Sequence, residues 1–241
     1  MSFAIPDLRR ALDDQGFAHL AAPDMGALLG PAAMAAWDAF AATWEDLGPD
    51  LYMADGGRYR RRRHAAFRLA DGVVARKPHQ PHYQSRDYNP LNGGVQRWFE
   101  PVGAEAEASP VTAAVLALCA DAFPPCPGGA AWHVEFHQFR IEAQPGEVGH
   151  PTPEGLHRDG VDWAFVMLVA RRNVAEGVTQ IGTPDGAEVG RFALTQPTDA
   201  VFLDDHRILH GVTPIHPLDP DQPAFRDVLV VTLAQAAPGA A

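Results

Sequence analysis

The stretch Trp163-Ala164-Phe165-Val166-Met167-Leu168-Val169 is an unbroken apolar run. Such a run, rich in aromatic and branched side chains, is typical of a β-strand that is buried on both faces. Similar short segments, separated by turn residues, lie on both sides of it. They predict strands over residues 132–141, 155–159, 163–169, 178–181, 188–194, 200–203, 208–212 and 225–233. Because no helical segment separates these strands, the pattern indicates a double-sheet sandwich or barrel.

The N-terminal part of the chain, residues 1–129, has a different pattern. Between residues 25 and 47, apolar side chains recur at steps of three and four, which predicts helices with a buried stripe. Ser109 and Pro110 suit the cap and the first position of a further helix. We predict a single domain over residues 1–241, mainly β with α. In it a mostly helical N-terminal part, with loops and one Arg-rich strand, packs against a jelly-roll (cupin-like) core over residues 130–235.

The composition limits the kinds of partner. The net charge of −11 argues against nucleic acid as the main partner, because phosphate contacts need a positive surface. Cys119 and Cys126 are the only cysteines, so the chain has no disulfide framework and suits a reducing compartment. The segment Met1–Asp7 lacks a basic region followed by an apolar run, and no apolar run is long enough to cross a bilayer. We expect a cytoplasmic protein without a signal peptide or a membrane partner.

A candidate metal site lies in Gly155-Leu156-His157-Arg158-Asp159-Gly160. In a strand, residues two apart point to the same face, with Cα atoms roughly 6.5 Å apart. His157 and Asp159 can therefore converge on one small cation, while Arg158 points away. A second imidazole, His210, comes from a later apolar segment. Two imidazoles and one carboxylate that leave one coordination face open are the ligand set of non-haem Fe(II) oxygenases.

Arg226, in the last predicted strand, extends this hypothesis. Its guanidinium group is a fixed fork of donors that suits a carboxylate. With the three candidate ligands it predicts an iron oxygenase that uses 2-oxoglutarate as co-substrate and O2 as oxidant. Two other classes remain open on the sequence. One is a cupin-type metal enzyme that does not use 2-oxoglutarate, and the other is a non-catalytic binding or regulatory jelly-roll protein.

Other histidines predict weaker metal sites. His133 and His137 flank Glu135, but four residues of a strand span about 13 Å, which is too far for two imidazoles to share one ion. His64 and His82 have no carboxylate in the pattern around them. The Pro-rich segment that contains His82 predicts a lid or a loop in a pocket wall.

The segment Arg58–Leu69 is a basic exception in an acidic chain. As a strand, it places arginines on both faces. One face predicts solvated charges or structural ion pairs, and the other can place one or two guanidinium groups in an anionic pocket. A nucleic-acid patch is disfavoured because the run is short and isolated.

Parts of the sequence resemble a known family. His157-Arg158-Asp159-Gly160 and the stretch Leu203–Ile215 look like the signature of bacterial 2-oxoglutarate/Fe(II)-dependent dioxygenases related to L-isoleucine hydroxylase. That group includes proteins associated with biofilm and motility. The stretch His137–Arg140 resembles a further family segment. The resemblance implies a double-stranded β-helix core and the hydroxylation of free aliphatic L-amino acids, or the sulfoxidation of methionine.

By this resemblance, His157, Asp159 and His210 hold Fe(II), and Arg226 binds the distal carboxylate of 2-oxoglutarate. Many relatives place Ser or Thr two residues after that arginine. Here Val228 stands at that position, so the sequence leaves the second partner of the carboxylate open. A zwitterionic small-molecule substrate needs one cation and one acceptor from the protein. The candidates for these roles are Arg68, Gln138 and Arg158. The oligomeric state is also left open.

Overall fold

A computed structural model of the protein describes residues 3–236. Residues 1–2 and 237–241 of the predicted domain, and with them the first two residues of the segment Met1–Asp7, lie outside the described residues. Antiparallel pairing produces a seven-stranded sheet with the order β1-β9-β5-β12-β4-β2-β3. A three-stranded sheet has the order β10-β7-β8, and β11 pairs with β6.

The strands have the following bounds: β1 (Phe17–Leu20), β2 (Arg60–Ala70), β3 (Val73–Arg76), β4 (Trp132–Ala143), β5 (Trp163–Arg172), β6 (Val174–Glu176), β7 (Val178–Gly182), β8 (Glu188–Ala193), β9 (Ala200–Asp204), β10 (Leu209–Val212), β11 (Ile215–Pro217) and β12 (Ala224–Gln235). The helices are α1 (Ile5–Gln15), α2 (Ala22–Ala35), α3 (Trp37–Ala42), α4 (Ala104–Glu107) and α5 (Pro110–Ala122), with a 3-10 turn η1 (Pro127–Gly129). None of the helices within residues 3–236 has the length and hydrophobicity of a membrane-crossing segment.

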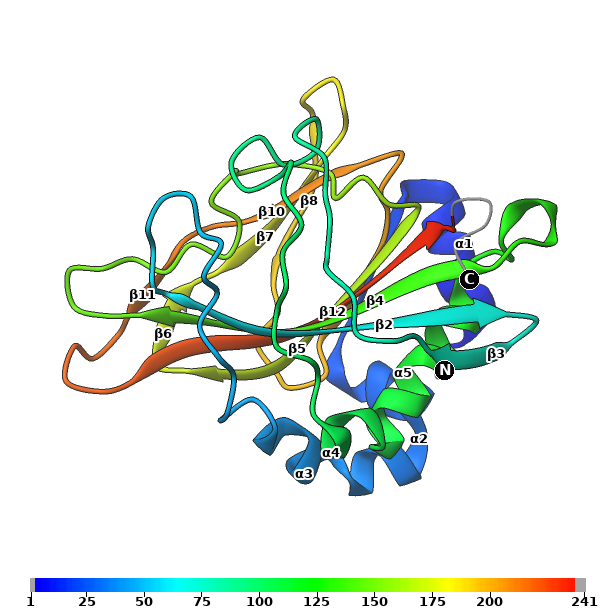
Figure 1. Cartoon of the computed structure of the whole chain (residues 1–241), viewed down its shortest axis with the longest axis horizontal. Helices are drawn as coiled ribbons and strands as arrows, with labels where there is room; N and C mark the ends of the chain where they lie inside the picture. Colours follow the sequence, from blue (N-terminus) through cyan, green and yellow to red (C-terminus); the bar gives the residue numbers. More distant parts are fainter. Residues whose placement is uncertain (1–2, 237–241) are drawn as a thin grey trace.

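The large sheet lies between two layers. Figure 1 shows helices α2 to α5 on one side of it and the strands β7, β8 and β10 on the other. The predicted class, mainly β with helices packed from the N-terminal half, is confirmed. The N-terminal part also adds β1, β2 and β3 to the large sheet, a larger contribution than the one Arg-rich strand predicted for it.

Alternation along the strands gives the large sheet two unlike faces. Phe136, Phe165 and Leu229 are buried on the helical side, in one hydrophobic cluster with Phe40 and Trp44. Because successive residues of a strand point to opposite sides, the neighbours of these residues along each strand face the smaller sheet. That second face carries arginine, histidine and glutamate side chains. The apolar side holds the fold together, and the polar side is available for a functional site.

Local sequence signals set several element ends. Helix α5 begins at Pro110, and the Ser109 side chain accepts a hydrogen bond of 3.2 Å from the Val111 backbone N–H, as the capping pattern predicted. The predicted strand over residues 155–159 is wrong. Gly155 and Gly160 have left-handed backbone angles of φ 79° at both residues, which ends extended structure there. His157 forms only an isolated bridge, to His210.

Removal of a core ring is expected to destabilise this fold strongly. Phe165 is fully buried, and its ring centroid lies 4.7 Å from that of Phe202. Phe165→Ala should lower the free energy of unfolding by about 3–5 kcal/mol, because it removes buried apolar surface and leaves a cavity. Urea denaturation measures the loss. The exposed Leu218 provides the control, since Leu218→Ala should change stability by less than about 0.5 kcal/mol. Equal effects of the two substitutions would contradict this assignment of the core.

Candidate active site

A cavity of about 490 Å³ lies on the polar face of the large sheet. Strand register brings its wall together, because Arg226 of β12 pairs with Ile141 of β4, and Ile141 pairs with Arg60 of β2. Two residues further along each strand, the same alignment joins Val228, Phe139 and Arg62. Residues from β10 and from the loop before β5 close the other side. The residues that this alignment brings to one cavity are spread over most of the chain.

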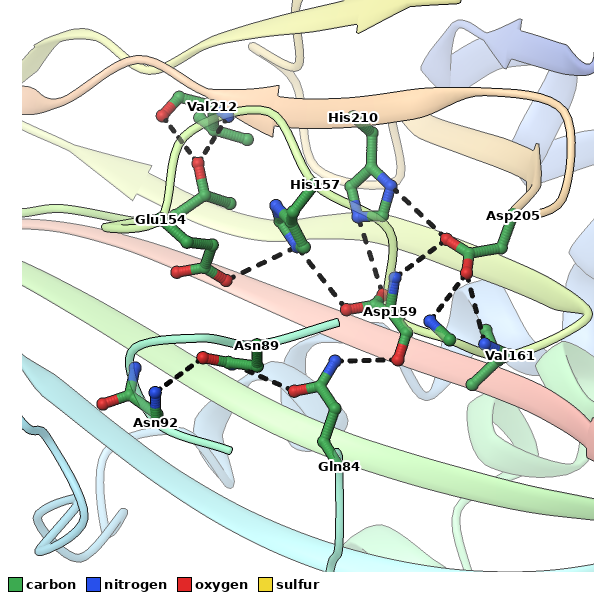
Figure 2. Close-up of polar contacts among 12 residues, drawn as sticks. Gln84, Asn89, Asn92, Glu154, His157, Asp159, Val161, Asp205, His210 and Val212 are labelled. Carbon is green, nitrogen blue, oxygen red and sulfur yellow. Dashed lines mark hydrogen bonds and ion pairs between the residues drawn. The ribbon is translucent and has the colours of Figure 1, made fainter. Parts of the chain in front are cut away.

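Three of the predicted site residues meet in this cavity. The carboxylate oxygens of Asp159 lie 3.5 Å from Nε2 of His157 and 3.5 Å from Nε2 of His210. One ligand atom from each residue falls within 4.8 Å of the others, a spacing that can hold one metal ion. Backbone hydrogen bonds of 3.0 and 2.9 Å between His157 and His210 fix the two imidazoles side by side. Figure 2 shows both rings pointing toward the Asp159 carboxylate.

A second carboxylate, Asp205, fixes the loop that carries Asp159. It accepts hydrogen bonds from the backbone N–H groups of Asp159, Gly160 and Val161 at 3.0, 2.8 and 3.2 Å (Figure 2). Its Oδ1 also lies 3.9 Å from Nδ1 of His210. The Asp205 carboxylate therefore accepts hydrogen bonds from backbone N–H groups that would bond to a neighbouring strand if this segment were the predicted strand.

Burial and neighbouring charges set the protonation of the site. Burial alone would raise the pKa of Asp159, but the hydrogen bond from His157 and the charge of His210 hold it well below its usual range. Burial and the neighbouring His157 lower the pKa of His210 to about 4. Burial and the charge of Asp159 raise the pKa of Asp205 to about 6. Burial alone would lower the pKa of His157, but the hydrogen bond to Asp159 and the charge of that carboxylate raise it to about 9. At neutral pH the site thus offers an ionised Asp159 and a neutral His210, which are the forms that bind a metal, and a His157 whose proton a metal ion would displace.

Glu154 is a further acidic residue at the site and was not among the predicted site residues. Its Oε1 lies 3.5 Å from Nε2 of His157, the same distance as the Asp159 carboxylate (Figure 2). Its Oε2 is buried and has no hydrogen-bond partner within residues 3–236. Glu154 stands in an irregular loop, and no sequence pattern marks it. Its carboxylate lies beside the His157 imidazole, in addition to that of Asp159.

Arg226 opens onto the same cavity. It is 2% exposed, and its Nε and Nη2 atoms have no acceptor among the described residues. Burial and the nearby Arg171 lower its pKa to about 10, so the group is still a cation at neutral pH. A buried cation with unsatisfied N–H groups has a strong preference for an anionic ligand.

The long crossover segment, residues 77–103 between β3 and α4, forms another wall (Figure 1). Within it, His82 and Arg97 pair through backbone hydrogen bonds of 3.0 and 2.9 Å. Gln84 donates a hydrogen bond of 2.8 Å to the carbonyl oxygen of Asp159 (Figure 2). The prediction that the segment around His82 lines a pocket is confirmed. Arg97 is not among the predicted site residues, because nothing in the local sequence pattern of this loop shows that it folds over the sheet.

A second group of possible ligands lies at the cavity, which His82, Glu135 and His137 line while His64 is buried behind them. Atoms of His64, His82, Glu135 and His137 lie within 4.8 Å of one another. The view that His64 and His82 lack a carboxylate is therefore wrong. β2 pairs His64 with His137, and the crossover segment places Nδ1 of His82 2.7 Å from the Glu135 carboxylate. The distance argument against a shared ion for His133 and His137 still stands, since the group does not contain His133.

The structure places the predicted substrate residues elsewhere. Arg68 is exposed at the end of β2, and Gln138 is buried on the opposite face of β4, where it donates a hydrogen bond of 2.8 Å to Thr43. Arg158 points away from the ligand cluster, as its place between His157 and Asp159 predicted, and lines a neighbouring groove. None of the three lines the cavity. Gln138 has the wrong strand parity, Arg68 lies near the far end of β2, and Arg158 points out of its loop.

Comparison with known proteins identifies related sequences. The family model described as 2OG-Fe dioxygenase matches residues 41–232. The 3(1)-hydroxy-L-isoleucine 4-dioxygenase of Pantoea ananatis (strain AJ13355) is 31% identical over 100 residues. That match covers 41% of this chain and 40% of the relative, so the chain aligns with less than half of that protein.

Solved structures extend the similarity to the whole chain. The crystal structure of a bsmA homolog from Methylobium petroleophilum PM1 is 38% identical and has a TM-score of 0.89, over 99% of this chain and 97% of the other. IDO from Bacillus thuringiensis shares the fold at 17% identity, with a TM-score of 0.81 over 97% and 100% of the two chains. The resemblance inferred from the sequence is confirmed. Since the family model matches most of its length, the chain belongs to the 2OG-Fe dioxygenase family, whose enzymes use Fe(II), 2-oxoglutarate and O2.

Proposed function

We propose that this dioxygenase hydroxylates a free L-amino acid or a similar small molecule, or oxidises its sulfur if the substrate is a thioether. In this proposal His157, Asp159 and His210 bind Fe(II), and Arg226 binds the distal carboxylate of 2-oxoglutarate. One observation carries the assignment. Arg226, a buried cation without an acceptor among residues 3–236, opens onto the same cavity as the three-residue ligand cluster.

The donor atoms suit Fe(II). Two imidazole nitrogens and one carboxylate oxygen leave three coordination positions for other ligands. Nδ1 of His157 donates a hydrogen bond of 2.9 Å to the carbonyl oxygen of Gly155, so Nε2 is the nitrogen that faces Asp159 and would bind a metal after loss of its proton. The ionised form of Asp159 supplies the negative charge. These features support a metal ion at this position rather than a simple hydrogen-bonded cluster.

Each residue has a defined task in the proposed reaction. When bound there, Fe(II) would supply the chemistry with O2, in which one oxygen atom goes into succinate as 2-oxoglutarate loses CO2 and the other goes into the substrate. Arg226 holds and orients the co-substrate through a charge-assisted fork in a buried site. Phe139, Val228 and Val230 provide an apolar wall that limits access of water to the reacting groups. No side-chain acid or base is required.

Cavity size and relatives support the substrate class. A cavity of about 490 Å³ is in the range typical of small-molecule sites. The curated relative is named for a hydroxylated L-isoleucine. A panel of free L-amino acids, incubated with Fe(II), 2-oxoglutarate and O2, tests the proposal. We expect one or more to stimulate succinate release and to gain one oxygen atom by mass spectrometry. Succinate release that no amino acid stimulates would contradict the substrate class.

Asp205 is expected to support metal binding without touching the metal. Asp205→Ala removes the acceptor for three backbone N–H groups of the Asp159 loop and the carboxylate beside His210. Loss of such an outer partner should weaken Fe(II) binding about 10- to 100-fold. Anaerobic titration of Fe(II) measures the dissociation constant. Asp121→Ala, at an exposed helical position, is the control. Equal Fe(II) affinity in both variants would remove Asp205 from the account.

A further inference from the structure

The cavity contains two buried guanidinium groups without a carboxylate partner among the described residues, one more than the distal carboxylate of 2-oxoglutarate can bind. Four arginines line it: Arg60, Arg62, Arg97 and Arg226. The Asp50 carboxylate accepts a hydrogen bond of 2.7 Å from Arg60 and lies 3.7 Å from Arg62. Arg97 and Arg226 have no carboxylate partner within the described chain, and each is 2% exposed. If Arg226 binds the co-substrate, Arg97 still lacks an anion.

Arg97 is held in the cavity close to the candidate metal ligands. Its Nη2 lies 3.4 Å from the side-chain oxygen of Gln84, whose amide in turn donates to the Asp159 carbonyl oxygen. Its Nε is buried without an acceptor among residues 3–236. A second anion that binds Arg97 would therefore lie beside the loop that carries Asp159.

Glu135 provides the opposite charge in the same cavity. Burial alone would raise its pKa, but His82 and the other surrounding imidazoles hold it well below its usual range. Burial lowers the pKa of His64, His82 and His137, so these rings are neutral at pH 7. Nε2 of His64 lies 3.3 Å from the carboxylate but makes no hydrogen bond of acceptable geometry. The group is an anion with an adjacent free imidazole nitrogen, a set of acceptors that suits a small cation.

We propose that Arg97 and Glu135 bind the substrate as a zwitterion, Arg97 through its carboxylate and Glu135 through its ammonium group. This inference rests on the proposed function and specifies its substrate as a free 2-amino acid. The crossover segment brings Arg97 to the face of β4 that carries Glu135, because the backbone pair His82–Arg97 places Arg97 in the cavity and His82 against Glu135. The apolar wall formed by Val161, Val166 and Val230 remains for an aliphatic side chain.

A second metal ion fits the Glu135 group less well. Arg62 Nη2 donates a hydrogen bond of 2.8 Å to Nδ1 of His137, so the neutral His137 carries its proton on Nε2, the nitrogen that faces Glu135. The Arg62 guanidinium is fixed between the rings of Phe99 and Phe139, at 3.7 and 4.3 Å from their centroids. Its charge opposes a dication at this position, whereas a zwitterion brings its own carboxylate to the arginines.

Substrate analogues test the proposal on the unmodified enzyme. Anaerobic protein loaded with Fe(II) and 2-oxoglutarate is titrated calorimetrically with the common free L-amino acids. For L-isoleucine, the matched probes are 2-methylbutylamine, which lacks the carboxylate, and 3-methylpentanoate, which lacks the ammonium group. For the amino acid that binds, we expect each corresponding analogue to bind at least about 30-fold more weakly, because each loses a buried charge-assisted contact.

Variants assign each contact to a residue. Arg97→Gln should weaken amino-acid binding about 30-fold or more and leave binding of the amine unchanged. Glu135→Gln should also weaken amino-acid binding but leave binding of the carboxylate analogue unchanged. Arg97→Lys, which keeps the charge, should recover part of the affinity. Arg61→Gln and Glu142→Gln are the controls, because these residues form a partly exposed ion pair of 2.8 Å between β2 and β4, outside the cavity.

The possible results separate this inference from the proposed function. The visible band of the Fe(II)–2-oxoglutarate complex should be intact in all of these variants. If that band is present but no free amino acid binds, the proposed zwitterion site is wrong. It is also wrong if Arg97→Gln binds the amino acid as tightly as the unmodified protein does. Displacement of the amino acid by a second equivalent of Zn(II) would assign the Glu135 group to a metal instead. Absence of the band in the unmodified protein would overturn the proposed function itself.

Discussion

Replacing Asp159 with alanine is expected to lower turnover about 10³-fold or more. Asp159 is the only carboxylate in the ligand cluster of His157, Asp159 and His210 found among the described residues. Without it, two imidazoles remain, and neither supplies the negative charge that favours a divalent ion. The neighbouring Glu154 carboxylate lies 3.5 Å from His157 but is not part of the cluster. Metal-ion chemistry is worth several kcal/mol, and each 1.4 kcal/mol or so is a tenfold change in rate. The measurement is succinate release at saturating 2-oxoglutarate with a fixed concentration of Fe(II).

A direct metal measurement separates loss of the ligand from loss of the fold. Asp159→Ala should keep its circular dichroism spectrum but bind little Fe(II) under anaerobic conditions. Asp185→Ala, in an exposed turn before β8, should behave like the unmodified protein. If Asp159→Ala bound Fe(II) with unchanged affinity, the metal would be coordinated elsewhere, and the group around Glu135 would be the first alternative to examine.

Replacing Arg226 with glutamine is expected to weaken 2-oxoglutarate binding about 30- to 3,000-fold. Loss of one partner from a buried charge pair typically costs about 2–5 kcal/mol. The cost is high here because Arg226 is buried, and its free N–H groups point at no other acceptor within residues 3–236. KM for 2-oxoglutarate should rise more than kcat falls, while Fe(II) binding changes little. Steady-state kinetics with 2-oxoglutarate as the varied substrate measures both.

Arg226 also separates this family from other metal enzymes with the same ligands. A cupin-type enzyme that does not use 2-oxoglutarate would tolerate Arg226→Gln with little loss of activity. Arg172→Gln, at an exposed position of β5, is the matched control. If both variants retained the unmodified KM, the distal carboxylate would bind elsewhere in the cavity, and Arg97 would be the next residue to replace.

The elements predicted most accurately are those with strong local signals. The apolar run at residues 163–169 is a strand of the large sheet, and Ser109 and Pro110 mark the start of α5. His157 and Asp159 converge because they lie two residues apart, and His210 joins them because β10 forms a backbone bridge with His157. That the whole chain forms one domain stays a prediction.

The parts of the site that the sequence did not predict depend on distant segments. His64 reaches Glu135 only because β2 aligns with β4, and His82 and Arg97 arrive on an irregular crossover segment. Neither alignment leaves a periodic pattern in the sequence. The loop at Asp159 was misassigned as a strand for a related reason. The acceptor that satisfies its backbone, Asp205, is 46 residues away in the sequence.

An anaerobic titration of Fe(II) and 2-oxoglutarate tests the central claim most directly, because the chelate has a weak visible charge-transfer band. We expect one equivalent of the complex per chain in the unmodified protein, none in Asp159→Ala, and a band in Arg226→Gln only at much higher 2-oxoglutarate concentration. A folded, unmodified protein that shows no band with both components present would contradict the assignment of this cavity as an iron and 2-oxoglutarate site.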